Sequence, residues 1–449
     1  MSKNKLRHMR TFGALSLASQ VEAALSFVTT AALVRLAGAA DAGQVLFAQA
    51  VAVVWFLLWD PRLEDAQQRF VPSEKMHGPG RGTQLYYRLV RLDFVAGVLA
   101  TVVGVGAAMA TAGLGWISTE LLWLMVPAVL GAGVATPAGS ASAGFALADQ
   151  LSRMGRTRLV LAPLNCAVTL AALASFGPVA YLAATVVTGL ISTIVLTVGA
   201  CQRVREACGP PAAEPVPMPP GLVPFLVKTS ATGSVSVASE SGVSLLAGVF
   251  GGPALVTYLK VAASMSRFFA SLISPVAAQL YPRLAEAGAL AHRRAVWRDA
   301  LRSSALTGGI GALAVAVTIP VSALLLRLVY GAEYTALSTA AVVLLAAAAL
   351  RGSVIWGKVL PPALGFPGVR LVFLLSEGAC QLSLVVFVTQ QWARAQDMAL
   401  GFAWSSFCLT MVSTGCWFLV LRILVTMMPE APTARSSSGA PREKSASAT

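Results

Sequence analysis

The chain has 449 residues, of which 56% are hydrophobic and only 12% are charged, whereas charged residues make up about a quarter of an average soluble domain. This composition excludes a water-soluble fold and predicts an all-α polytopic membrane protein, because each membrane-crossing helix needs about 20 mostly apolar residues. The formal net charge of +14 would suit a nucleic-acid-binding protein if the chain were soluble.

Apolar runs bounded by charged residues, glycine and proline predict about twelve membrane spans. The first half holds six, at 12–36, 43–60, 92–113, 121–147, 159–177 and 179–200. The second half holds the other six, at 222–249, 254–280, 303–327, 337–357, 370–390 and 399–425. We therefore expect two six-helix bundles around a central cavity.

The predicted spans divide the chain into five parts. An N-terminal segment (1–11) precedes the first bundle (12–200), and a proline-rich segment (201–221) separates it from the second bundle (222–425). Proline cannot continue a helix, so residues 201–221 are predicted to form a semi-rigid linker. The polar tail (426–449) is low in aromatic residues and is predicted to be disordered.

Lysine and arginine are distributed unevenly between the two sides of the predicted membrane. With both termini inside, the inner segments hold 27 of the 33 basic residues, and the outer loops hold Arg35, Arg327 and Arg394. Because basic residues concentrate in cytoplasmic loops, this bias predicts cytoplasmic termini and accounts for the net charge without a nucleic-acid partner. Contacts with membrane lipids are a further expectation. The 26 arginines against 7 lysines are typical of a GC-rich bacterial genome, so we expect a bacterial plasma membrane.

Histidine and cysteine offer little material for catalysis or metal binding. The three histidines lie far apart, and the six cysteines lie in apolar stretches or beside basic loops. We therefore expect no metal site, no cofactor, no catalytic residues and no disulfide framework.

A weak internal repeat relates the two halves. Shifting the sequence by about 213 residues brings Gly38–Gln44 onto Gly251–Thr257, and Asp60-Pro61 near Ser274-Pro275. Repeated halves are common in secondary transporters.

Ionisable side chains inside a membrane are costly, so each of them suggests a function or a partner. The eighth span carries a polar stripe within about 80° of its circumference, made of Lys260, Ser264, Arg267, Ser271 and Ser274. The seventh span has a broader polar face, made of Lys228, Thr229, Thr232, Ser236, Ser239 and Glu240. The two spans are predicted to line a hydrophilic cavity with a cationic bias. Glu240 and Lys260 lie at similar depth, so these two charges could instead neutralise one another.

Three carboxylates are candidates for proton or cation coupling, namely Glu22, Glu240 and Glu377. A buried carboxylate can titrate near neutral pH. Glu22 and Glu377 each have a glutamine nearby on the same span, and interhelical hydrogen bonding is the alternative role for both.

Short motifs resemble those of a known transporter family. Arg35, Gly38 and Gly43 are similar to that family's first outer turn, and the stretches Leu280–Leu284 and Leu328–Tyr334 supply further matches. The chain thus resembles the polysaccharide-exporter (oligosaccharide flippase) branch of the multidrug/oligosaccharidyl-lipid/polysaccharide exporter superfamily. It departs from the pattern at Ala42, where an aromatic residue is common, and at Glu240-Ser241.

The resemblance implies a flippase that moves an undecaprenyl-diphosphate-linked glycan from the inner to the outer leaflet for cell-surface polysaccharide biosynthesis. A polysaccharide polymerase or glycosyltransferases would then be partners. We expect Lys260 and Arg267 to bind the diphosphate, since arginine offers bidentate contacts to it. Lys228 would make a first contact near the inner surface. Hydroxyl groups of the seventh span would bind sugars, and those of the eighth complete the polar stripe.

Three other functions stay open, one of which is a non-transporting scaffold for a polysaccharide assembly complex. A drug or natural-product antiporter of the same superfamily would favour an anionic or aromatic cavity, which the basic stripe argues against. A membrane glycosyltransferase with a polyprenyl donor would need an outer carboxylate, whereas the adjacent acids Glu64-Asp65 fall in a predicted inner loop.

Overall fold

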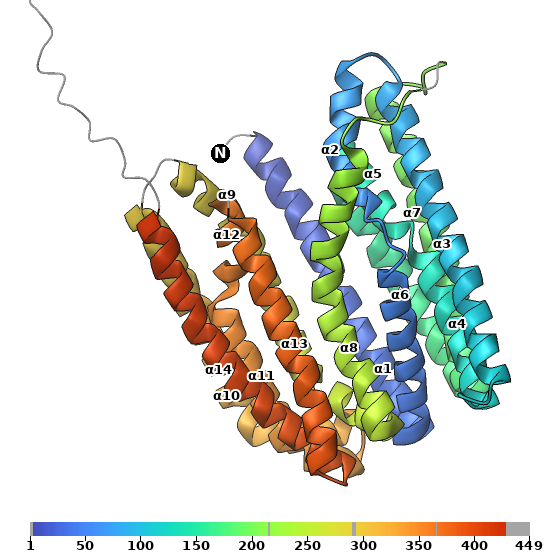
Figure 1. The fold of residues 1–449 in the computed structure, drawn as a ribbon, viewed down its shortest axis with the longest axis vertical. Coiled ribbons are helices and arrows are strands. Elements are labelled where there is room, and N and C mark those ends of the chain that lie inside the picture. The colour runs from blue at the N-terminus through green and yellow to red at the C-terminus, as the bar shows by residue number, and fades with distance from the viewer. Residues whose placement is uncertain (1–2, 214–215, 290–292, 365, 428–449) are drawn as a thin grey trace, which may run out of the picture.

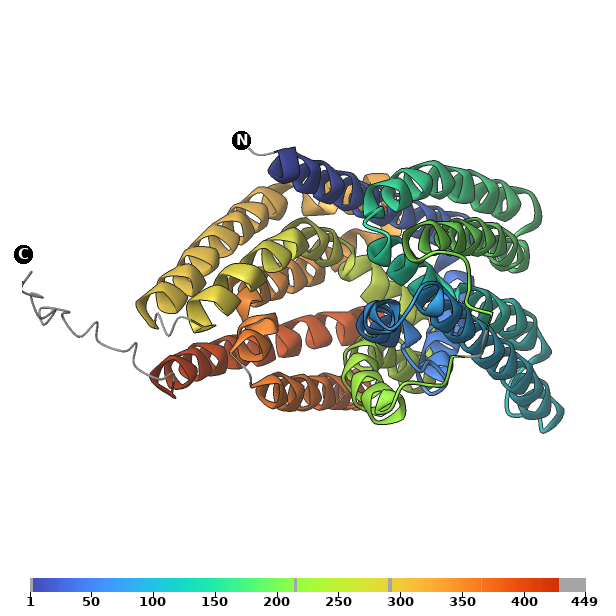
Figure 2. The same cartoon turned by 90° about the horizontal axis from the view of Figure 1, so that it is seen from above.

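The structure, a computed structural model, describes residues 3–213, 216–289, 293–364 and 366–427. All regular elements in these ranges are helices, and ten helices there are long and apolar enough to cross a membrane. Figure 1 shows them as two bundles, and Figure 2 shows the bundles side by side from above. The predicted all-α polytopic fold is confirmed, and the predicted tail lies almost wholly outside the described residues.

The first bundle contains α1 (Lys3–Leu57), α2 (Leu63–Met76), α3 (Arg81–Gly113), α4 (Thr119–Ala135), α5 (Ala138–Leu147), α6 (Leu151–Phe176) and α7 (Pro178–Cys208). The second contains α8 (Leu222–Ala262), α9 (Ser264–Ala289), α10 (Arg293–Val329), η1 (Ala332–Leu337), α11 (Ser338–Ser353), η2 (Ile355–Lys358), α12 (Leu360–Ala363), α13 (Pro367–Gln391) and α14 (Ala395–Met427). Here η marks a 3₁₀ helix.

Two glycines interrupt α1 and α8 in the same way. Gly38 has φ 81° and ψ 174°, and Gly252 has φ 80° and ψ 172°. This backbone region is essentially restricted to glycine, and at each glycine the chain turns from one predicted span into the next without a longer loop. The two glycines align at a shift of 214 residues, one more than the shift first inferred, and this shift also superposes Pro61 on Pro275.

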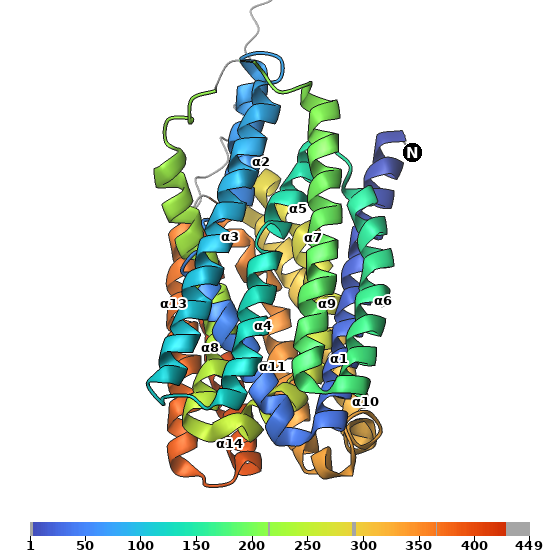
Figure 3. The same cartoon turned by 90° about the vertical axis from the view of Figure 1, so that its right-hand side faces the viewer.

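The helices depart from the predicted spans in several places; for example, α3 begins at Arg81 and α10 at Arg293, each about ten residues before its predicted span. The first inner loop contains the helix α2, and the fourth span is broken into α4 and α5, which follow one another through the bundle (Figure 3). Pro137 stands at this break, where it acts as the N-cap of α5. The sixth span continues as α7 to Cys208, eight residues into the predicted linker, because residues 201–208 contain neither glycine nor proline.

The large apolar cluster that the two bundles share lies at one end of the described structure. Near Gly38 and Gly252, one apolar cluster joins both bundles and includes Leu33, Val45, Leu255, Val256 and Tyr330. Also at this end, the Thr257 hydroxyl donates to the Ala39 carbonyl at 2.7 Å. At the other end, each bundle has a cluster of its own, one around Leu85 and Val204 and the other around Val296 and Trp417. The start of α1, α2 and the end of α14 lie at this second end (Figure 1), called the linker end below.

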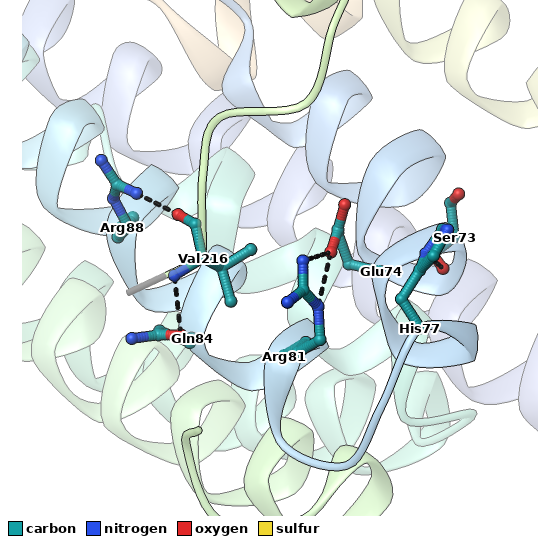
Figure 4. A network of polar contacts seen from close by, with 7 residues as sticks. All are labelled: Ser73, Glu74, His77, Arg81, Gln84, Arg88 and Val216. Carbon is teal, nitrogen blue, oxygen red and sulfur yellow. Dashed lines mark hydrogen bonds and ion pairs between the residues drawn. The ribbon is translucent and has the colours of Figure 1, made fainter. Parts of the chain in front are cut away.

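The proline-rich linker is bound to the first bundle. The Val216 N–H donates to Gln84 Oε1 at 3.1 Å, and Arg88 donates to the Val216 carbonyl (Figure 4). The Ala212 N–H donates to the Gly80 carbonyl at 3.3 Å. The Val216 side chain is fully buried, so these contacts fasten the linker to the start of α3.

The first turn of α8 also belongs to the first bundle. Leu222 is buried in that bundle's own cluster. The ring of Phe225 packs edge-on against Phe70 of α2 at 5.6 Å between centroids, and the Arg69 guanidinium lies 4.6 Å from the Phe225 centroid. The covalent link between the bundles therefore runs through α8 beyond these residues.

Candidate functional site

A cavity of about 390 Å³ lies between the two bundles. The first bundle contributes walls from α1, α4 and α7, and the second contributes walls from α8 and α9. Its polar lining residues are Gln49, Thr185, Glu240, Ser241, Ser244, Lys260 and Arg267. A cavity between two packed bundles is where a secondary transporter usually binds its substrate.

Two cations from the second bundle line this cavity. Lys260 lies near the end of α8 and Arg267 lies in the first turn of α9. The short break at Ala263 separates these helices, and backbone hydrogen bonds from Ala263 to Leu259 and from Arg267 to Ala263 continue the helical path. Both cations thus project from one nearly continuous helical rod into the same cavity.

Glu240 of α8 is the acidic group in the cavity wall. Within the described residues, no lysine or arginine nitrogen lies within 4.0 Å of its carboxylate. The direct Glu240–Lys260 ion pair considered from the sequence is therefore not formed in this structure. Two cations and one anion give the lining a net positive charge, which suits an anionic ligand.

A smaller cavity of about 170 Å³ adjoins the same two cations. Lys260 and Arg267 line both cavities, whereas the predicted ligand residue Ser264 lines only the smaller one. Ser264 is buried, and its hydroxyl donates to the Val261 carbonyl at 2.7 Å. Aromatic rings of Phe27, Phe268 and Tyr330 complete this second wall, which is consequently more apolar than the first.

Other predicted ligand residues lie elsewhere. The Ser271 hydroxyl donates to Gln20 Oε1 at 3.2 Å, and Gln20 Nε2 donates to the Ser271 carbonyl at 2.7 Å, so Ser271 joins α9 to α1. Ser239 packs against α13, since a Cβ added to Gly378 would lie 2.8 Å from the Ser239 Cβ. The side chains of Lys228, Thr232 and Ser236 lie outside the described residues.

Two of the three candidate coupling carboxylates are held in ion pairs. Glu22 of α1 pairs with Arg158 of α6 through both of its oxygens. Glu377 of α13 accepts from Arg351 of α11 at 2.6 Å. These pairs join neighbouring helices within one bundle, so Glu240 differs from both other candidates in lining the cavity.

Sequence reasoning missed the polar groups that the first bundle supplies. Gln49 of α1 and Thr185 of α7 line the cavity from the first bundle, across from the second-bundle helices that carry the cations. Gln49 was detectable as a polar residue within a predicted span, whereas Thr185 gave no distinctive signal in an apolar run.

Comparisons with known proteins identify the fold. No model of a known protein family matches the chain, and no curated protein matches its sequence. An inward-facing multidrug-resistance MATE family transporter of the MOP superfamily matches with a TM-score of 0.71 and 13% identity, over 91% of this chain and 96% of that one. An outward-facing structure described in the same terms matches with a TM-score of 0.64 and 12% identity, over 93% and 96%.

A third similar structure is a MOP superfamily transporter from Pyrococcus furiosus, whose description attributes a different function to the reversed polarity of its binding pocket. It has a TM-score of 0.65 and 13% identity, over 92% of this chain and 96% of that one. At this level of identity, the likeness shows a shared fold, that of transporters with twelve helices in two bundles.

Proposed function

We propose that this protein is an alternating-access transporter that moves a polyprenyl-diphosphate-linked oligosaccharide from the inner to the outer leaflet. Lys260 and Arg267 bind the diphosphate in the cavity between the bundles. Membrane lipids surround the protein, and the enzymes that assemble or polymerise the glycan are its functional partners. It resides in a bacterial plasma membrane with the linker end facing the cytoplasm.

The observation that carries this proposal is the pair of cations on one wall of the cavity. A diphosphate presents several anionic oxygens, which arginine can contact in a bidentate manner and lysine as a point charge. Because Lys260 and Arg267 line two adjoining cavities, a diphosphate held between them has space on either side for its attached groups. Hydrogen-bonding groups such as Gln49 and Thr185 in the larger cavity suit a sugar.

The packing of the bundles supports alternating access. The shared cluster closes the end that contains Gly38 and Gly252, while the linker end has separate clusters. With the linker end in the cytoplasm, this is an inward-facing state. The higher TM-score with the inward-facing than with the outward-facing solved structure agrees with that assignment.

A drug or natural-product exporter of the same fold is the second candidate. The solved relatives described as multidrug-resistance transporters favour it, and Glu240 could bind an organic cation. The two cations beside Glu240 disfavour such a ligand, because like charges repel at close range.

Mass spectrometry of co-purifying lipids tests the proposal. The protein is purified from its native host as wild type, as the Lys260→Ala/Arg267→Ala double variant, and as a control with Arg203→Ala. Arg203 pairs with Glu206 on its own helix and lines neither cavity, so it matches the loss of a basic side chain without touching the cavities.

We expect wild type and the Arg203→Ala control to retain a polyprenyl-diphosphate glycan that the double variant loses. Retention by the double variant would contradict the cationic site. If wild type carries no such lipid and instead binds organic cations in a manner that Glu240→Gln abolishes, the exporter function replaces the flippase.

A further inference from the structure

Asp93 is a buried carboxylate in the first bundle, away from the cavity between the bundles. It lies twelve residues after the start of α3 and is 2% exposed. The Ser140 hydroxyl of α5 donates to its carboxylate at 2.5 Å, and Gln67 Nε2 of α2 donates to that hydroxyl at 2.9 Å. The Tyr86 hydroxyl donates to the Ser140 carbonyl at 3.0 Å. Three helices therefore meet in one buried polar network.

No cation neutralises Asp93 among the residues that the structure describes, where every ion pair within 4.0 Å involves other acids. The charged groups that face it are acidic, namely Asp60 after α1 and Glu64 of α2. Arg62, the nearby base, lies 3.5 Å from both Glu64 and Asp65. An ionised, unpaired carboxylate in such a site is strongly disfavoured, whereas a protonated carboxyl group is not.

A second observation also points to a bound proton. Gln67 is fully buried, and its Oε1 atom has no hydrogen-bond donor in the described part of the chain. The network formed by Asp93, Ser140 and Gln67 thus contains more acceptors than donors. A proton bound to this network adds the missing donor and removes the negative charge.

The second bundle shows that helix packing does not require an acid at this position. At the shift of 214 residues defined by Gly38 and Gly252, Asp93 corresponds to Thr307 of α10. Thr307 is likewise fully buried, and its hydroxyl donates to the Gly352 carbonyl of α11 at 2.8 Å. A neutral side chain therefore suffices to join the equivalent helices, so the acid of Asp93 adds a property beyond packing.

We propose that Asp93 is a proton-binding site of the first bundle, which exchanges its proton with water at the linker end by way of Glu64. The Glu64 carboxylate is half-buried and approaches the start of α5, where a Cβ added to Gly139 would lie 3.0 Å from Glu64 Oε2. Ser140, the next residue, contacts Asp93. Glu64 therefore lies between solvent and the start of α5, next to the residue that contacts Asp93.

Proton binding at Asp93 has a short physical route to the substrate cavity. Ser140 lies eight residues after Ala132, a cavity-lining residue of α4, across the break at Pro137. Release of the proton leaves a negative charge on Asp93, which attracts the Ser140 hydroxyl and thereby pulls on the start of α5. Coupling to transport rests on the proposed function, whereas proton binding itself does not.

Infrared difference spectroscopy of the purified full-length protein tests this site, because a protonated carboxyl group has a carbonyl band distinct from that of a carboxylate. Spectra are recorded without substrate from neutral to alkaline pH, in H₂O and in D₂O. Wild type is compared with Asp93→Asn, Asp93→Thr, Glu64→Gln and the control Asp41→Asn. Asp93→Thr introduces the residue found at the equivalent position of the second bundle, and it provides a second neutral variant if Asp93→Asn does not fold. Asp41 is an exposed acid at the opposite end.

We expect a protonated-carboxyl band in wild type at neutral pH that disappears as the pH rises. Both Asp93 variants lose it, Asp41→Asn keeps it, and Glu64→Gln keeps it with at least about tenfold slower deuterium exchange. Absence of the band from wild type, or its persistence in folded Asp93 variants, would overturn the proposal. Loss of the band in Glu64→Gln would assign the proton to Glu64 instead. Since no substrate is present, failure of this test leaves the flippase proposal to be judged separately.

Discussion

Both halves of this protein have a glycine with a positive φ at the equivalent position, but the residues that follow this glycine line the central cavity with different chemistry. After Gly38, the first half sends Leu46 and Val53 into the central cavity, and after Gly252 the second half sends in Lys260 and Arg267. These pairs are separated by the same 214 residues as the two glycines. Equivalent positions of the repeat thus form opposite walls, one apolar and one cationic.

This difference separates what the repeat preserves from what it leaves variable. Both halves keep the glycine with a positive φ. Next to these glycines α1 packs closely against α8, and this contact holds the bundles together at one end. The charge of the cavity comes from one half alone. The acid Asp93 shows the reverse distribution, since its counterpart in the second half is Thr307.

The largest expected effect comes from erasing the charge difference between the halves. The Lys260→Leu/Arg267→Val variant gives the second half the residues of the first. A hydrogen bond to a charged group contributes about 1.5–3 kcal/mol, so losing two should weaken binding of geranylgeranyl diphosphate by at least about 100-fold. Isothermal titration calorimetry on the purified protein measures this change.

The control for this variant removes side chains from the apolar wall. We expect Leu46→Ala/Val53→Ala to change the affinity for geranylgeranyl diphosphate by less than about tenfold, because neither side chain carries a polar group for the diphosphate. Equal losses in both double variants would mean that cavity shape, not charge, determines binding.

An intermediate effect is expected at the two glycines. Gly38→Ala and Gly252→Ala should each lower the free energy of unfolding by about 1–3 kcal/mol, because a side chain strains this backbone region. No atom crowds either position, so strain alone is measured. Gly106→Ala, in the open interior of helix α3, should instead be neutral or stabilising by up to about 1 kcal/mol. Thermal unfolding in detergent compares these three variants. If only one of Gly38→Ala and Gly252→Ala lowered the stability, the two halves would not share the need for a glycine at this break.

The smallest effect concerns Glu64, whose position in the repeat is occupied by Ala278 in the second half. Burial raises the pKa of the Glu64 carboxyl group above its ordinary value of 4.5, and Asp60 and Asp65 add to this shift. The folded protein therefore holds this proton more tightly than the unfolded chain does. The stability that the bound proton gives to the folded state is lost as the pH rises from 4.5 through the raised pKa. Glu64→Gln should flatten this part of the stability profile in melting temperatures measured from pH 4 to 7. An unchanged slope would contradict the pKa shift.

Much of the fold follows from the sequence, because long apolar runs and the distribution of basic residues report directly on the membrane. The same reasoning brought Glu240, Lys260 and Arg267 to attention, since charges inside apolar runs are conspicuous. The break between α4 and α5 was less evident, because proline also occurs inside continuous membrane helices. Pro127, for example, lies within α4.

Partners across helices could not be read from the sequence. The ion pair between Glu22 and Arg158 joins residues 136 positions apart, and it depends on which helices are neighbours. Asp93 escaped attention because it follows Arg91 at the predicted start of a span, where an acid is unremarkable. Only the helix start at Arg81 shows that Asp93 lies well inside the bundle.

The bound linker has a consequence for how far apart the halves can move. A free proline-rich tether would set their separation by its length, but Gln84, Arg88 and Gly80 hold this one against the first bundle. Residues inserted into its exposed stretches would bulge outward into solvent and would not change the distance by which the two halves can separate. The effective tether is the part of α8 between Phe225 and the break at Gly252, so the movement of one half relative to the other is limited by how far this helical segment can tilt.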